Sequence, residues 1–277
     1  MNEGDIMRIT VLNENMVYKK NLIAEHGLSA LIEFNNKKIL LDTGQSDVFI
    51  KNAKTLGVDL NNLDAIIISH GHYDHGGGLD YLNEINNIPN IYISTKALIP
   101  KFSINKKKNK YYFNGIDVDD NIKNHFHYID DKEEIFKGVY LISNIPYSND
   151  FESKPRGFYI KQKDKMLPDL MYDEQILVVE TSNGLSLFMG CSHMGIINAV
   201  SYVKDIFKDK KIYSLFAGMH LINADKNRVD NTIEMLKKEN INYIMPCHCT
   251  GYKVSAKISE EFKNSYIEVQ CGSVIEI

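Results

Sequence analysis

A ten-residue stretch rich in metal-ligand side chains constrains this chain more than any other feature. The stretch runs from Ser69 to Gly78 and reads Ser-His-Gly-His-Tyr-Asp-His-Gly-Gly-Gly. The apolar, β-branched run 65–69 leads into it and predicts a buried strand, and the glycines at its end predict a turn before a helix over 79–85. We therefore expect the ligand-type side chains on a loop at the carboxyl end of a strand, where α/β folds build their sites.

The spacing within this loop predicts two sets of metal ligands. His70 and His72 would hold one ion, and Asp74 and His75 would hold a second ion close by. The alternative is a polar surface loop that happens to contain histidines. Since three of the nine histidines of the chain lie within six residues, metal binding is the better interpretation.

Composition and charge are those of an ordinary globular protein. The 277 residues suit one large α/β domain or two small ones, and 44% of them are hydrophobic. A net charge of −4 argues against a nucleic-acid partner, and the lack of a long apolar run argues against a membrane span. The acidic run 1–5 does not resemble a secretory signal, and the four cysteines are few and irregularly spaced, so a cytoplasmic location is expected.

The first sixty residues predict strands over 9–12, 28–34 and 37–42 and a helix over 47–56. Asp42 ends the third strand. It either hydrogen-bonds a metal-bound histidine and fixes its tautomer, or caps the following helix. His26 precedes the second strand on a loop that either overhangs a pocket or is simply solvated.

The region 101–165 differs in character and predicts an insertion or cap on the core. It contains the basic cluster 106–110, the aromatic run 111–113, and the cations Lys154 and Arg156. These side chains either bind an anionic substrate group or form a solvated hairpin tip. Strands are expected near 139–145 and 158–163.

The C-terminal half repeats the pattern of a strand followed by a ligand. Strands are expected over 176–181, 185–189, 211–217 and 243–245, and helices over about 196–207 and 228–240. His193, His220 and His248 each come just after an apolar strand. A single histidine in such a place is usually structural, but three of them are difficult to explain by core packing.

These motifs together resemble the metallo-β-lactamase superfamily over nearly the whole chain. One branch is especially similar, the metal-dependent hydrolases related to the dihydropterin–ribofuranosylaminobenzene-phosphate synthases. The resemblance implies an α/β protein of the α+β type, an αββα sandwich of two facing mixed sheets with helices outside, in one domain over 1–277. The motifs that carry it are Leu41–Gly44, Ser69–His75, Gly190–His193 and Pro246–His248, and for the branch Glu25–Ser29, Gly218–Leu221 and Cys247–Gly251.

By the same resemblance, one metal is held by His70, His72 and His193, and a second by Asp74, His75 and His248. Asp42 matches the aspartate that, in this superfamily, hydrogen-bonds a metal-bound histidine without binding the metal itself. Zn²⁺ is the default for such ligands, one or two ions per chain, and the Asp74 carboxylate also permits Mn²⁺ or Fe.

One departure from the superfamily concerns a bridging aspartate. Many members place it after the strand that here ends at Ala217, where this chain has Gly218-Met219-His220 and no acid before Asp225. His220 is therefore expected either to coordinate metal or to contact substrate.

The expected function is hydrolysis of a small, anionic or phosphorylated substrate by a metal-activated water. Asp74 would orient the water and take up its proton, and His220 would stabilise the developing negative charge. The alternatives are a transferase that condenses a pterin pyrophosphate with an aryl amine, and a metal-binding module without catalysis. His26, Lys154 and Arg156 are the expected substrate contacts. The oligomeric state stays open.

Overall fold

The computed structural model describes residues 6–208 and 210–277, so the run 1–5 lies outside the part discussed below. The chain divides into two compact units. Unit 1 contains the described residues up to Ile129 together with Gly157–Asp169 and Gln270–Ile277, and unit 2 contains Asp130–Arg156 and Leu170–Val269. Each unit has its own mixed sheet and is described by itself.

The main sheet of unit 1 has seven strands in the order β17-β1-β2-β3-β4-β5-β8. The strands from β17 to β3 pair antiparallel, whereas β3, β4, β5 and β8 pair in parallel. The carboxyl ends of β3 and β4 therefore meet at one edge of the sheet, which brings the residues after Leu41 close to those after Ile67. The strands are β1 (Arg8–Asn13), β2 (Ser29–Phe34), β3 (Lys37–Leu41), β4 (Ala65–Ile67), β5 (Ile91–Ile93), β8 (Phe126–Tyr128) and β17 (Val274–Glu276).

Short helices pack against this sheet and complete the core of unit 1. Phe49 of α1 and Leu79 of η1 belong to one buried cluster with Leu40 and Ile66 of the sheet. Helix α1 ends at Gly57, whose φ of 70° is the left-handed conformation that glycine adopts at low cost. The helices are α1 (Val48–Leu56), α2 (Tyr73–Gly76), α3 (Asp120–Lys123), and the 3₁₀ helices η1 (Gly77–Glu84) and η2 (Thr95–Leu98).

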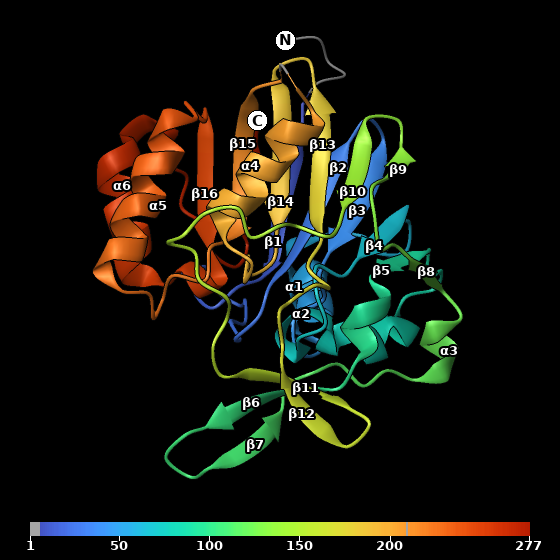
Figure 1. Cartoon of the computed structure of the whole chain (residues 1–277). Coiled ribbons are helices and arrows are strands. Elements are labelled where there is room, and N and C mark those ends of the chain that lie inside the picture. Colours follow the sequence, from blue (N-terminus) through green and yellow to red (C-terminus); the bar gives the residue numbers. More distant parts are fainter. Residues whose placement is uncertain (1–5, 209) are drawn as a thin grey trace. The chain divides into compact units, whose positions relative to one another are not determined.

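A second, four-stranded sheet in unit 1 has the order β12-β11-β6-β7 (Figure 1). Lys101 at its start is almost completely buried, and its Nζ lies 2.8 Å from a carboxylate oxygen of Asp169. Such a pair tolerates burial because each charge neutralises the other. The strands are β6 (Lys101–Asn105), β7 (Lys110–Phe113), β11 (Phe158–Gln162) and β12 (Lys165–Pro168).

The sheet of unit 2 has six strands in the order β16-β15-β14-β13-β10-β9. Strands β14, β15 and β16 are parallel neighbours, so their carboxyl ends lie at one edge. The strands are β9 (Glu133–Phe136), β10 (Val139–Ile142), β13 (Ile176–Thr181), β14 (Gly184–Met189), β15 (Ile212–Gly218) and β16 (Tyr243–Cys247). The helices α4 (Ile196–Ile206), α5 (Lys226–Lys238) and α6 (Tyr252–Phe262) are labelled in Figure 1. The unit also contains the 3₁₀ helices η3 (His248–Thr250) and η4 (Lys263–Ser265).

The buried carboxylate of Glu152 lies against the first turn of helix α4. Glu152 accepts hydrogen bonds from the backbone N–H groups of Ile197 and Asn198 at 2.9 and 2.8 Å, which satisfies donors that a helix leaves unpaired at its first turn. Burial raises the pKa of Glu152 above its ordinary value, although these hydrogen bonds oppose the shift.

Most of the predicted elements are present with small changes at their ends. The helix predicted over 79–85 is instead the 3₁₀ helix Gly77–Glu84, because three successive glycines favour tight turns over a regular α-helix. The interval 101–165 is divided between the units, with 130–156 in unit 2 and the remainder in unit 1, and its role as a cap stays a prediction. Within 6–208 and 210–277, no helix has the length and apolar character needed to cross a membrane.

Candidate metal centre

In unit 1, the predicted ligand loop leaves strand β4 and is fixed by backbone contacts. His72 forms an isolated antiparallel bridge with Gly115, and the N–H of Tyr73 donates to the carbonyl of Asn114 at 3.0 Å. Gly71 is required in this loop, since an added Cβ would overlap the carbonyl of Ala97. These contacts fix the backbone path of the loop within unit 1.

Asp42 lies behind the loop and bonds two of its residues. Its fully buried carboxylate contacts Nδ1 of His75 at 2.6 Å, and it accepts from the N–H and the hydroxyl of Ser69 at 2.7 and 2.8 Å. A carboxylate that holds Nδ1–H leaves Nε2 with a lone pair to bind a metal. Of the two alternatives for Asp42, the structure thus shows contact with a histidine, whereas helix α1 begins after Asp47.

His70 and His72 face each other across the loop. Nε2 of His70 lies 3.0 Å from Nδ1 of His72, and Nδ1 of His70 lies 3.0 Å from the Ser69 hydroxyl. Burial, together with the neighbouring rings of His75 and His72, lowers the pKa of His70 well below its usual value. The ring is therefore neutral near pH 7, which is the form that binds metals.

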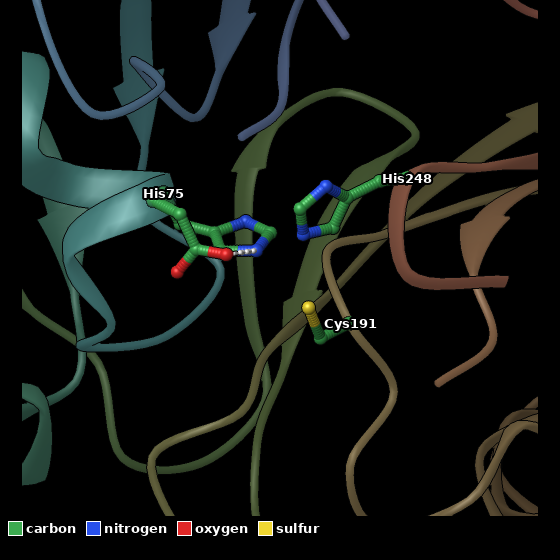
Figure 2. Close-up of side chains that lie close together, drawn as sticks. His75, Cys191 and His248 are labelled. Carbon is green, nitrogen blue, oxygen red and sulfur yellow. Dashed lines mark ion pairs between the residues drawn. The ribbon is translucent and has the colours of Figure 1, made fainter. Parts of the chain in front are cut away.

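Asp74 lies between two histidines. One of its carboxylate oxygens is 3.1 Å from Nε2 of His26 and 3.8 Å from Nε2 of His75, and the second contact is drawn as a dashed line in Figure 2. Asp74 is buried, while the His26 side chain is 55% exposed. His26 is therefore placed to connect this carboxylate with solvent.

In unit 2, three histidines follow three adjacent parallel strands. His193 comes after β14, His220 after β15, and His248 directly after β16. The rings of His193 and His220 lie 4.2 Å apart between centroids. The N–H of Gly218 donates to the carbonyl of Gly190 at 2.8 Å, and this bond ties the ends of β14 and β15 together.

Two cysteines lie among these histidines. The Sγ of Cys191 is within 4.8 Å of a ring nitrogen of His193 and of one of His248; Cys191 and His248 are both labelled in Figure 2. The Sγ of Cys249 accepts from the backbone N–H of His220 at 3.2 Å and donates to the carbonyl of Cys191 at 3.4 Å. The sequence analysis did not select either thiol, although Cys191 stands two residues before His193.

In unit 2, contact between Cys249 and His220 shifts the pKa of each, and burial shifts the pKa of Glu174. Burial opposes ionisation of Cys249, but hydrogen bonds with Cys191 and His220 lower the pKa of its thiol well below the usual value. Burial likewise opposes a charge on His220, yet its hydrogen bond with Cys249 raises the pKa of the imidazole. Burial raises the pKa of Glu174 to about 7, and its carboxylate accepts from the N–H groups of His193 and Met194.

Of the predicted substrate contacts, His26 lies beside Asp74 in unit 1, and Lys154 and Arg156 lie in unit 2. In unit 1, His72 stacks on Phe158 of β11 with ring centroids 5.2 Å apart, so the small sheet adjoins the ligand loop. In unit 2, Nζ of Lys154 lies 5.8 Å from the ring centre of Tyr147, and Arg156 follows two residues later. Contact of these cations with a substrate stays a prediction.

Comparison with known proteins defines the family. Residues 23–140 match the model of the metallo-β-lactamase superfamily. The chain is 33% identical to a 7,8-dihydropterin-6-methyl-4-(beta-D-ribofuranosyl)-aminobenzene-5'-phosphate synthase of Methanocaldococcus jannaschii, over 100% of this chain and 99% of that protein. An uncharacterized protein of the same organism is also 33% identical, over 97% of this chain and 100% of its own length.

A solved structure agrees with these relatives. A crystal structure of a metal-dependent hydrolase of the beta-lactamase superfamily matches with a TM-score of 0.84 and 30% identity, over 98% of this chain and 99% of that one. The chain therefore belongs to the metallo-β-lactamase superfamily. Its α+β class and its similarity to the branch that contains the synthase, both predicted from motifs, are confirmed.

Proposed function

We propose that the chain is a metal-dependent hydrolase that acts on a small anionic or phosphorylated substrate. The observation that carries this proposal is the network in which Asp42 holds Nδ1 of His75 in a buried loop of histidines. A fold without metal has little reason to bury so many imidazoles beside one carboxylate. In this proposal the ligands are His70, His72 and His193 for one ion and Asp74, His75 and His248 for a second.

The donors described above fit a transition metal. His70 is neutral, Nε2 of His75 is left for coordination by the bond of Nδ1 to Asp42, and Asp74 adds one negative charge. Imidazole and carboxylate ligands suit Zn²⁺, Mn²⁺ and Fe. One or two such ions would supply Lewis acidity, which lowers the pKa of water and polarises a carbonyl or phosphoryl oxygen.

Side chains of the proposed site would transfer the proton of the attacking water and stabilise the negative charge that develops on the substrate. Asp74 would orient the attacking water and accept its proton, and His26 at 3.1 Å would pass that proton towards solvent. His220, whose raised pKa favours the imidazolium form, would stabilise negative charge on the substrate. Lys154 and Arg156 would bind a phosphate group of the substrate through charge-assisted hydrogen bonds.

A transferase is the second candidate, because the full-length relative is named a synthase. In that reaction a pterin pyrophosphate would lose its pyrophosphate, while the nitrogen of an aryl amine forms the new bond and releases a proton. The same acids and bases could serve both reactions, although water attacks a carbonyl or phosphoryl centre in the first and the amine nitrogen replaces pyrophosphate on carbon in the second.

Pyrophosphate release, measured with and without an aryl amine acceptor, separates the two candidates. A hydrolase would release pyrophosphate without the amine, and a transferase would require it. Metal content is the prior test: elemental analysis should show one to two ions in the native chain and a large loss in His72→Ala. Unchanged metal in a folded His72→Ala protein would overturn the ligand assignment.

A further inference from the structure

The strand ends of unit 2 contain imidazoles and thiols but no carboxylate. The segments 190–193, 218–220 and 247–250 hold three histidines and three cysteines, and the next acid after His220 is Asp225, at the start of α5. The superfamily resemblance leads us to expect a bridging aspartate at the end of β15, and residues 218–220 supply none. If this chain holds metal, any anionic ligand from these three segments must be sulfur.

The two thiols near His220 are not equivalent. Cys249 is held by the backbone, since its sulfur accepts from the N–H of His220 and donates to the carbonyl of Cys191. Cys191 is buried, and its sulfur lies within 4.8 Å of ring nitrogens of His193 and His248, one from each proposed ligand set.

Building on the proposed function, we propose that Cys191 is a ligand of the metal centre and provides a thiolate in place of a bridging carboxylate. Cys249 is a positioning residue that holds the loop of Cys191 against the end of β15. A thiolate beside imidazoles selects thiophilic ions, so the centre should prefer Zn²⁺, and Co²⁺ as its spectroscopic substitute, over Mn²⁺.

Cobalt spectroscopy tests this ligand without an activity assay. The full chain is kept reduced and anaerobic, stripped of metal, and reloaded with Co²⁺. The native protein should show a thiolate-to-cobalt charge-transfer band in the near ultraviolet. Cys191→Ser should lose the band and weaken cobalt binding by at least about tenfold, the lower end of the loss that follows removal of an outer partner of a ligand.

Three further variants complete the test. Cys191→Asp should restore cobalt binding without the band, because a carboxylate can replace the thiolate. Cys249→Ser should keep the band, and so should Cys271→Ser, which changes a buried cysteine of unit 1. A band that survives in Cys191→Ser, or native protein that binds cobalt without a band, overturns the proposal for Cys191 and leaves the hydrolase proposal standing. Native protein that binds no cobalt or zinc overturns both.

Discussion

Replacing Asp42 with asparagine tests whether this carboxylate sets the tautomer of His75. Asp42 is fully buried and bonds Nδ1 of His75 at 2.6 Å and both polar groups of Ser69 at 2.7 and 2.8 Å. An ionised carboxylate only accepts hydrogen bonds, so Nδ1 carries the proton and Nε2 is free of it. In Asp42→Asn the amide nitrogen would donate to Nδ1, and the ring proton would move to Nε2.

The expected loss falls on metal binding more than on folding. Loss of an outer partner of a metal ligand weakens binding by about 10- to 100-fold, which corresponds to roughly 1.4–2.7 kcal/mol. Folding of the metal-free chain should change by only about 1 kcal/mol, since asparagine can still bond Ser69 and His75 and loses mainly the charge assistance. A larger loss in the free energy of metal binding than in the free energy of unfolding of the metal-free chain would therefore identify Asp42 as a residue that orients a metal ligand.

Zinc competition with a chromophoric chelator measures the first effect, and urea unfolding of the metal-free proteins measures the second. Asp64→Asn is a matched control, because Asp64 also bonds a backbone N–H and a side chain, those of Lys38 and Lys37. A folded Asp42→Asn protein with native zinc affinity would refute this reasoning.

Four other changes have defined outcomes. Asp74→Asn should keep its far-UV spectrum and at least one metal ion while turnover falls by about 10²- to 10⁴-fold, because an amide cannot take up the proton; near-native turnover would refute the role. Arg156→Ala should raise KM for a phosphorylated substrate without changing metal content, and an unchanged KM would exclude it from the site. Lys101→Met should destabilise the chain by about 3–5 kcal/mol in urea unfolding by removing the buried ion pair with Asp169, and adding Asp169→Leu should recover most of that loss. Since burial raises the pKa of Glu152, its contribution to the free energy of unfolding is complete below the usual pKa of glutamate, about 4.3, and is lost as pH rises through the raised value; Glu152→Gln should flatten this dependence in urea unfolding, and an unchanged slope would contradict the assignment.

The sequence predicted most of the strands and the histidines that follow them, because buried runs that end in histidine are local patterns. Position along the chain did not decide between the two alternatives for Asp42, although the family resemblance favoured contact with a histidine. The partner of Asp42 is 33 residues away, and the contact depends on the parallel pairing of Leu41 with Ile67, which no local pattern encodes. Cys191 was missed for a similar reason: its significance depends on β14, β15 and β16 being adjacent, and a lone cysteine after a strand is otherwise an ordinary buried residue.

Backbone conformation gives a further reason to connect these strand ends with function. Asp42, Ser192, His220 and His248 have φ values of 56°, 50°, 47° and 48°, in the left-handed region that costs most residues of order 1 kcal/mol or more. Glycine would remove this backbone cost at each position, although at Asp42 it would also remove the buried hydrogen bonds to Ser69 and His75. Asp42, His220 and His248 instead carry side chains that the proposed site requires, and Ser192 orients the chain between Cys191 and His193. Left-handed backbone also occurs at non-glycine residues elsewhere in the chain, so it does not by itself mark function. At these four positions, each just after a parallel strand, it lets the chain turn so that the side chains of the proposed site lie at the carboxyl ends of their own sheets.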